Sequence, residues 1–157
     1  MADQLPIVAR LQDEVAELKR ELNQDIPKAL EEARAHGDLK ENAEYHAAKE
    51  RQGILNARIG QMEQRIGELS RYSISSIPRD RVGYGSKVEV EDLDSGDTEV
   101  YELVFPEEAD PGKGHVSMTS PLGSAFVNKR VGDEVSVQTP AGRRKFEVFK
   151  LATYHDR

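Results

Sequence analysis

The chain has 157 residues, of which 32% are charged and 6% are aromatic, and its formal net charge is −7. Its length allows one domain of ordinary size or two small ones. It has no apolar run long enough to cross a membrane and no cysteine, which excludes disulfides and cysteine-ligated zinc. Its acidity makes it a poor candidate for an autonomous DNA binder. We therefore expect a cytoplasmic protein with no membrane association.

Two heptad seams of apolar residues predict an antiparallel pair of helices in the first half of the chain. The first seam comprises Val8, Leu11, Val15, Leu18 and Leu22, and the second comprises Leu55, Ile59, Met62, Ile66 and Leu69. Each residue of the first seam has a counterpart in the second at the same distance along the chain from the midpoint between Asp38 and Leu39. A fold-back at that midpoint makes a coiled-coil hairpin with arms of about 30 residues, roughly 45 Å long.

The first seam is interrupted before the bend. Asp25 stands where the next apolar residue is due, and the apolar pattern restarts out of register at Ile26. Pro27 has no N–H group, so it should kink the first helix unless a helix restarts there. Beyond the bend, Ala43, Ala47 and Ala48 are small enough to let the two arms approach closely, which predicts a slender tip.

The bend itself reads HGDLKENAEYH, residues 36–46. Gly37 suits the end of the first helix, since glycine adopts the left-handed conformation common there. Asp38 and Glu41 have the spacing of a capping box at the start of the second helix. The same two carboxylates also suit Mg²⁺, which completes its coordination with water and phosphates. They are too few for a self-sufficient two-metal site. The pattern thus favours a helix cap, a metal site completed by another macromolecule, or both.

The other residues of the bend have predicted supporting roles. Leu39 is the apolar residue at the apex, where it could cover the alanines or contact the inside of a partner's channel. Asn42 could orient a carboxylate or serve as an alternative cap. Glu44 is expected to support the tip, and Tyr45 to pack beside the alanines. We predict that these four residues stabilise the tip without carrying its chemistry.

The second half of the chain changes to strand-like segments separated by glycines and prolines, which predicts a small, mostly antiparallel sheet. The expected strands are residues 87–91, 99–105, 115–118, 134–138 and 145–151, with a short helix at 124–129. The fold class is therefore α+β. The predicted organisation is a hairpin at 1–74, a linker at 75–81 and a sheet domain at 82–157. The last four residues, YHDR, are expected to fray.

Residues 36–49, HGDLKENAEYHAAK, resemble the coiled-coil tip of the bacterial Gre transcript-cleavage factors. Four segments of the second half resemble the C-terminal domain of the same family, whose fold is FKBP-like: 107–110, 120–125, 131–135 and 139–142. Three places in the sequence depart from the family pattern. Residues 4–7 (QLPI) replace a Thr-x-x-Gly pattern, Asn128 stands where glycine is usual, and Phe105 and Pro106 are atypical after the second strand.

The resemblance implies a factor that binds RNA polymerase through its second domain, at the rim of the secondary channel, and inserts its coiled coil into that channel. Asp38 and Glu41 would act in trans in the polymerase active site, where they help to hold a shared Mg²⁺ and a water. This stimulates cleavage of the 3′ end of backtracked nascent RNA. The resemblance also implies that the chain is not itself an enzyme and that it carries no Mg²⁺ alone. The mirrored seams, which favour pairing within one chain, predict a monomer.

The resemblance also suggests further contacts. Lys40 and Lys49 are candidates for a weak contact with the RNA, because the basic residues of the hairpin are interspersed with acids. Ser120, Pro121 and Gly123 are candidates for the polymerase-facing loop, although turn chemistry explains these residue types equally well.

Three other readings compete with this one. A Gre-like channel binder that inhibits polymerase without cleavage is one, but the tips of such paralogues depart from DLKEN. A self-sufficient nuclease or prolyl isomerase is another, although so few aromatic residues offer no evident pocket. The third is a dimerising coiled coil, against which the mirrored seams favour pairing within one chain.

Overall fold

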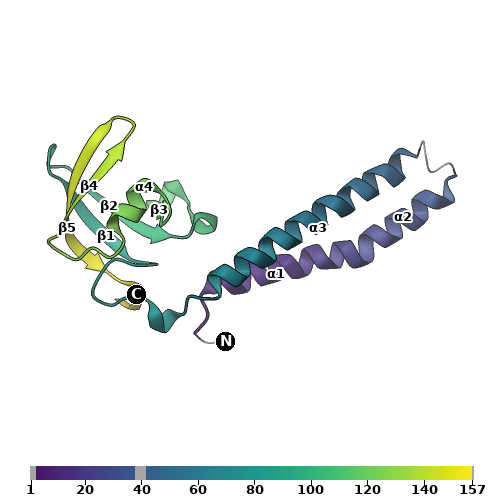
Figure 1. Cartoon of the computed structure of the whole chain (residues 1–157), viewed down its shortest axis with the longest axis horizontal. Helices are drawn as coiled ribbons and strands as arrows, with labels where there is room; N and C mark the ends of the chain where they lie inside the picture. Colours follow the sequence, from purple (N-terminus) through teal and green to yellow (C-terminus); the bar gives the residue numbers. More distant parts are fainter. Residues whose placement is uncertain (1–2, 38–41, 157) are drawn as a thin grey trace. The chain divides into compact units, whose positions relative to one another are not determined.

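The computed structural model describes residues 3–37 and 42–156. The chain divides into two compact units, Met1–Ser75 and Ser76–Arg157 (Figure 1). Most of the segment predicted as a linker, residues 75–81, is thus grouped with the second unit. Within that unit the Ile77 carbonyl lies 2.8 Å from Nε2 of His155, which ties the start of the unit to its end.

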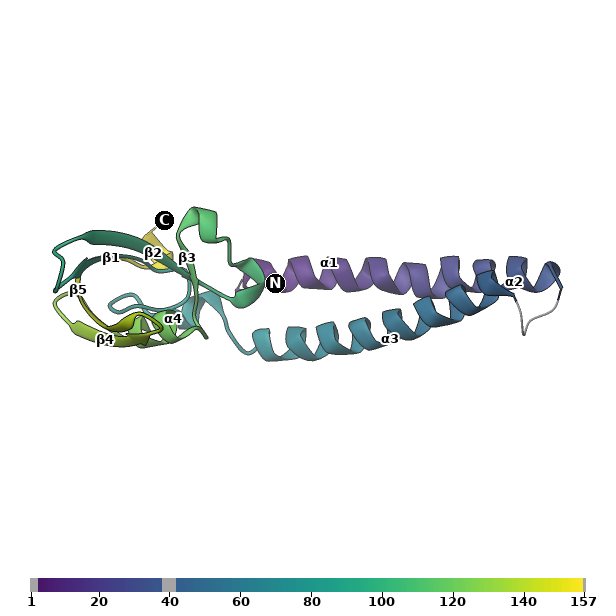
Figure 2. The same cartoon turned by 90° about the horizontal axis from the view of Figure 1, so that it is seen from above.

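The first unit is a helical hairpin, as the mirrored seams predict. One arm consists of α1 (Pro6–Arg20), a π-helix (Glu21–Asp25) and α2 (Ile26–Ala35), and the other arm is α3 (Ala43–Leu69). The two arms lie side by side and run antiparallel in both views (Figures 1 and 2). Six residues of the predicted seams are buried and the other four are half-buried; the buried six are Val8, Leu11, Val15, Leu55, Ile59 and Leu69.

The π-helix explains the break in the apolar pattern. Its last bond joins the Ile26 N–H to the Glu21 carbonyl, five residues back. A π turn accommodates one extra residue, which shifts the seam from the expected Asp25 to Ile26. Pro27 lies in the first turn of α2. Its ring would clash with the carbonyl of Asn23 in a regular α-helix, and that carbonyl lies within the π turn. The first arm therefore restarts as α-helix beside the proline.

The base of the hairpin is closed by residues just before α1. Leu5 is the N-cap, and Pro6 occupies the first helical turn, where a missing N–H costs nothing. The Asp3 carboxylate accepts hydrogen bonds of 2.8 Å from both the N–H and the hydroxyl of Ser75. The Asp3 carbonyl accepts a third from the N–H of Ile74, at 2.9 Å. The unusual residues 4–7 are thus compatible with a proline-initiated helix whose start is held to the residues that follow the other arm.

The second unit is built on a five-stranded sheet in the order β3-β2-β1-β5-β4. The strands are β1 (Lys87–Asp92), β2 (Thr98–Val104), β3 (His115–Ser117), β4 (Glu134–Thr139) and β5 (Gly142–Ala152). β3 pairs parallel with β2, and the remaining neighbours are antiparallel. The prediction of a small, mostly antiparallel sheet is confirmed.

Helix α4 (Pro121–Phe126) contributes the central residue of the apolar core, Phe126, which packs against this sheet. Phe126 is fully buried, and its ring centroid lies 5.7 Å from that of Phe146 and 5.9 Å from that of Tyr101. The buried cluster around it draws on β1, β2, β4 and β5; its members are Val82, Val88, Val90, Leu103, Phe126, Val135, Val137, Phe146 and Val148. The helix and the sheet therefore share one core.

Two local predictions for this unit are wrong. The short helix begins at Pro121 and not at 124, because the Ser120 hydroxyl caps it by accepting from the Gly123 N–H at 3.0 Å. Residues 154–156 are also not frayed, because Asp156 accepts from the Thr153 N–H at 2.7 Å and from its hydroxyl at 3.1 Å; Arg157 lies outside the described residues. In place of the usual glycine, Asn128 adopts a φ of 69°, which asparagine tolerates better than most residues. In the described part of the chain, no helix is long and apolar enough to cross a membrane.

Candidate functional site at the hairpin tip

The four central residues of the tip, Asp38, Leu39, Lys40 and Glu41, lie outside the described residues. What the structure does describe is the last turn of α2 and the first turn of α3, which flank them. These two turns determine where the chain leaves one arm and enters the other.

The last turn of α2 is tightened. The N–H of His36 bonds to the Ala33 carbonyl at 3.1 Å, and that of Gly37 to the Arg34 carbonyl at 3.3 Å. Both bonds reach back three residues and not four, a common way for a helix to end. Gly37 has a φ of +114°, so its predicted role as the residue that ends the first arm is confirmed.

The N-cap of α3 is Asn42. Its side-chain Oδ1 accepts from the N–H of Tyr45 at 3.1 Å, and α3 begins at Ala43. The capping box predicted for this helix at Asp38 and Glu41 is therefore wrong, and the alternative prediction, that Asn42 is the cap, is confirmed. Asparagine caps a helix as well as aspartate does, and its amide also carries a donor. That donor, Nδ2 of Asn42, bonds to the Ala33 carbonyl of α2 at 2.6 Å.

Other side chains of the first turn of α3 also meet the opposite arm. Tyr45 is half-buried, and the guanidinium carbon of Arg34 lies 6.0 Å from its ring centroid. The ring of His46 lies edge-on to that of Tyr45, with centroids 5.9 Å apart. Glu44 is exposed in the same turn, where a carboxylate interacts favourably with the positive end of the helix.

The basic residues along the arms differ in what they contact. Lys49 is exposed, and its Nζ lies 3.0 Å from Oε1 of Gln52. Arg51 makes a two-point contact with Glu21 across the hairpin, at 2.7 and 3.0 Å. These bonds from Arg51 hold the pKa of the Glu21 carboxyl below its ordinary value. Arg51 is thus engaged in joining the arms, whereas the RNA contact of Lys40 and Lys49 stays a prediction.

The candidate polymerase-facing residues form the start of α4. Ser120 is the cap, and its hydroxyl donates to the Ser117 carbonyl at 2.7 Å. Gly123 is buried, and a Cβ added to it would collide with that same carbonyl. Packing therefore explains Ser120 and Gly123, while Pro121 is exposed. A contact with polymerase at this loop stays a prediction.

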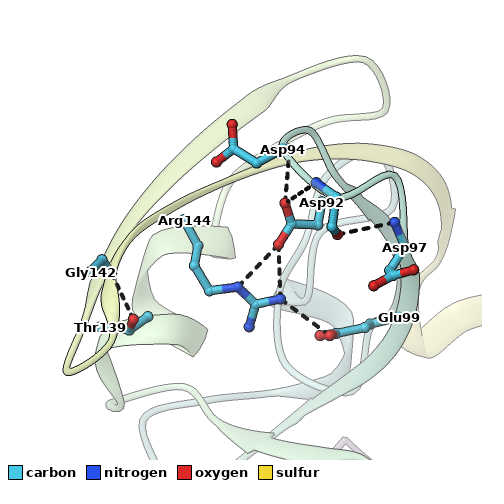
Figure 3. Close-up of polar contacts among 8 residues, drawn as sticks. Asp92, Asp94, Asp97, Glu99, Thr139, Gly142 and Arg144 are labelled. Carbon is cyan, nitrogen blue, oxygen red and sulfur yellow. Dashed lines mark hydrogen bonds and ion pairs between the residues drawn. The ribbon is translucent and has the colours of Figure 1, made fainter.

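A second charged cluster lies at one end of the three inner strands of the sheet, β1, β2 and β5 (Figure 3). Arg144 of β5 bonds to the Asp92 carboxylate at 3.0 and 3.2 Å and to Glu99 at 3.2 Å. The N–H groups of Asp94 and Ser95 donate to the same Asp92 carboxylate and, with Arg144, hold its pKa below the ordinary value. Asp92 thus closes the β1–β2 turn and ties it to β5. This is a structural role, which the sequence alone did not suggest.

Within residues 3–37 and 42–156, no three His, Cys, Asp or Glu side chains are grouped so that they could hold a metal ion. The predicted Mg²⁺ ligands, Asp38 and Glu41, lie outside those ranges. A pair of carboxylates has the chemistry of Mg²⁺ ligation, but it needs further ligands from elsewhere.

Comparisons with known proteins cover nearly the whole chain. Residues 7–70 match the family model described as "Transcription elongation factor, N-terminal", and residues 77–153 match "Transcription elongation factor, GreA/GreB, C-term". The chain is 42% identical over 157 residues to transcription elongation factor GreA of Desulfotalea psychrophila, with 98% of each covered. It is 45% identical over 143 residues to that of Nitratidesulfovibrio vulgaris, with 91% and 89% covered. The crystal structure of GreA factor homolog 1 from Thermus thermophilus matches at 32% identity and a TM-score of 0.43, covering 92% of this chain and 94% of that one.

Proposed function

Because the chain belongs to the GreA/GreB family of transcription elongation factors, we propose that it rescues arrested RNA polymerase by stimulating transcript cleavage. In this proposal the second unit binds the rim of the secondary channel and the hairpin enters the channel. Asp38 and Glu41 then complete an Mg²⁺ site in the polymerase, which hydrolyses the 3′ end of backtracked RNA. The factor acts as a monomer in the cytoplasm and lends ligands to another protein's active site.

The observation that carries this proposal is the cap of α3. Asn42 supplies the cap that the sequence pattern assigned to Asp38 and Glu41. That helix start therefore does not account for two carboxylates in the centre of the tip. Their chemistry suits Mg²⁺, and their number suits an ion that a partner already half coordinates.

The proposal also gives roles to the flanking residues. Two contacts join the arms beside the tip. Asn42 bonds to Ala33, and Arg34 lies over the ring of Tyr45. The exposed Pro121 offers the second unit a contact for polymerase, and Lys49, with Lys40, offers a weak one for RNA.

The decisive experiment is RNA cleavage in a backtracked polymerase complex, with and without Mg²⁺. Asp38→Asn combined with Glu41→Gln should leave polymerase binding intact and slow cleavage on the order of a hundredfold, because the shared ion loses its charged ligands. Glu44→Gln, which neutralises an exposed carboxylate one turn further along, is the matched control. Full cleavage by the double variant would contradict the proposal. Slower nucleotide addition by the wild-type protein without RNA trimming would instead indicate a non-cleaving channel binder.

A further inference from the structure

One side chain, that of Asn42, bonds to the ends of both helices at the tip. The Ala33 carbonyl lies in the last turn of α2, where it also accepts from the His36 N–H, and Tyr45 lies in the first turn of α3, where N–H groups have no partner within the helix. Nδ2 of Asn42 donates to the first at 2.6 Å, and Oδ1 accepts from the second at 3.1 Å. The two bonds use both functional atoms of the amide.

The residues around this amide allow the close approach that the bond requires. Ala33 is 1% exposed and Ala48 is 8% exposed, so small side chains separate the arms at this level. Aspartate could accept from Tyr45 but could not donate to Ala33, and serine could cap α3 but is too short to reach across. Among good N-cap residues, asparagine is suited to both bonds.

We propose that Asn42 is a positioning residue for transcript cleavage. By bonding to both arms it fixes the relative positions of Gly37 and Asn42, between which residues 38–41 run. Catalytic ligands tolerate little displacement, so the two residues that flank them in the chain should be held in place. This inference rests on the proposed function, since it assigns Asn42 the task of helping to place Asp38 and Glu41.

The test separates the cross-hairpin bond from the cap. Asn42→Ser keeps a good cap and removes the bond to Ala33, and Asn42→Asp does the same with a carboxylate. Asn56→Ser and Asn56→Asp are matched controls on the exposed surface of α3. Helix content is checked by circular dichroism, and cleavage by backtracked complexes is measured across factor and Mg²⁺ concentrations.

Both Asn42 variants should lower the maximal cleavage rate at saturating factor by about tenfold or more. The factor concentration for half-maximal cleavage should stay within about twofold, since polymerase binding is not touched. The Mg²⁺ concentration for half-maximal cleavage should rise, and excess Mg²⁺ should restore part of the rate. A purely structural role would not change the Mg²⁺ requirement.

Wild-type maximal rates in both Asn42 variants would overturn the inference, as would equal losses in the Asn56 controls. A loss confined to Asn42→Asp would assign the effect to charge, and a loss with an unchanged Mg²⁺ requirement would assign it to general destabilisation. Either result would also overturn the inference. An inactive wild-type protein would instead contradict the proposed function itself, so the two failures are distinguishable.

Discussion

The hairpin and the sheet domain bury their apolar residues in different ways. In the hairpin the buried side chains form a single line between two arms, and several seam residues remain half-exposed. In the sheet domain, α4 and four strands enclose one compact cluster centred on Phe126. In a line of contacts, truncating one buried side chain disturbs the packing of only a short stretch of the arms. In a shared core, the same change disturbs the packing of every element that lines the core. The two units should therefore respond differently to equivalent changes.

The units also differ in how they use glycine. Gly53, Gly60 and Gly67 are spaced one heptad apart on the exposed surface of α3. Apart from the neighbouring residues and backbone of the helix itself, no described atom lies within 4 Å of a Cβ added to any of them. In the sheet domain, Gly123 is packed directly against the Ser117 carbonyl. The hairpin therefore contains glycines that packing does not require, whereas at Gly123 a side chain is excluded.

The largest expected effect is in the shared core. Phe126→Ala should lower the free energy of unfolding of the sheet domain by about 3–5 kcal/mol, because it removes a fully buried ring and leaves a cavity. Phe149→Ala is the matched control, since Phe149 is 44% exposed on β5. Chemical denaturation followed by tyrosine fluorescence measures both. Equal effects of the two substitutions would contradict the assignment of the core.

A smaller loss is expected from the corresponding change in the hairpin. Leu55 is fully buried in the seam, and its neighbour Ile54 is 49% exposed. Leu55→Ala should lower the free energy of unfolding of the hairpin by about 2–3 kcal/mol. This is near the low end of the range for buried leucines, because a seam between two helices collapses more readily around the cavity. Ile54→Ala should change stability by less than about 0.5 kcal/mol. Helix melting by circular dichroism distinguishes the two, and a larger loss than for Phe126→Ala would reverse the comparison.

The third effect should have opposite signs in the two units. Changing Gly53, Gly60 and Gly67 together to alanine should stabilise the hairpin by about 2 kcal/mol, since each exposed helical glycine costs roughly 0.5–1 kcal/mol. Gly123→Ala should instead destabilise the sheet domain by about 1–3 kcal/mol through the clash with Ser117. Thermal melting of each variant checks both signs. A gain in stability from Gly123→Ala would show that the β3–α4 turn can relax.

The sequence predicted the elements well where the pattern is local and regular. Strand-like segments separated by glycines are sufficient to place the sheet. The mirrored heptads are sufficient to place the hairpin. The choice of cap was not predictable in this way. Asp38 and Asn42 are both good N-caps, and the bond that distinguishes Asn42 goes to Ala33, a partner nine residues away on the other arm. The C-terminal residues were likewise misjudged because their partners, such as Ile77, are distant in sequence.

The π turn illustrates a third situation. Asp25 and Pro27 marked an irregularity, but a kink, a restart and an inserted residue all fit the same letters. The packing of the arms selects among them, because only a shift by one residue returns Ile26 to the buried seam. The two tip carboxylates, Asp38 and Glu41, remain predictions from their chemistry and from the family resemblance.

The smallest expected effect is the loss of folding stability on acidification. Its dependence on salt should differ between the two units. The Asp92 pKa is held below its ordinary value of 3.8, first by the N–H groups of Asp94 and Ser95 and then by Arg144. The unfolded chain therefore binds this proton more readily, so the stabilisation is present above about pH 4 and is lost as the pH falls through the lowered pKa. In the hairpin, bonds from Arg51 lower the pKa of Glu21 in the same direction.

The causes of these two shifts differ in their sensitivity to salt. Glu21 is held by an exposed ion pair, which salt screens, whereas Asp92 is held mainly by backbone N–H groups within a turn. High salt should therefore reduce the contribution of Glu21 to the acid sensitivity of the hairpin and leave the contribution of Asp92 to that of the sheet domain. Asp92→Asn should remove the latter by deleting the titrating group. Thermal melting of each unit between about pH 5 and pH 2, at low and high salt, measures these contributions. Equal salt effects on the acid sensitivity of both units would contradict the prediction.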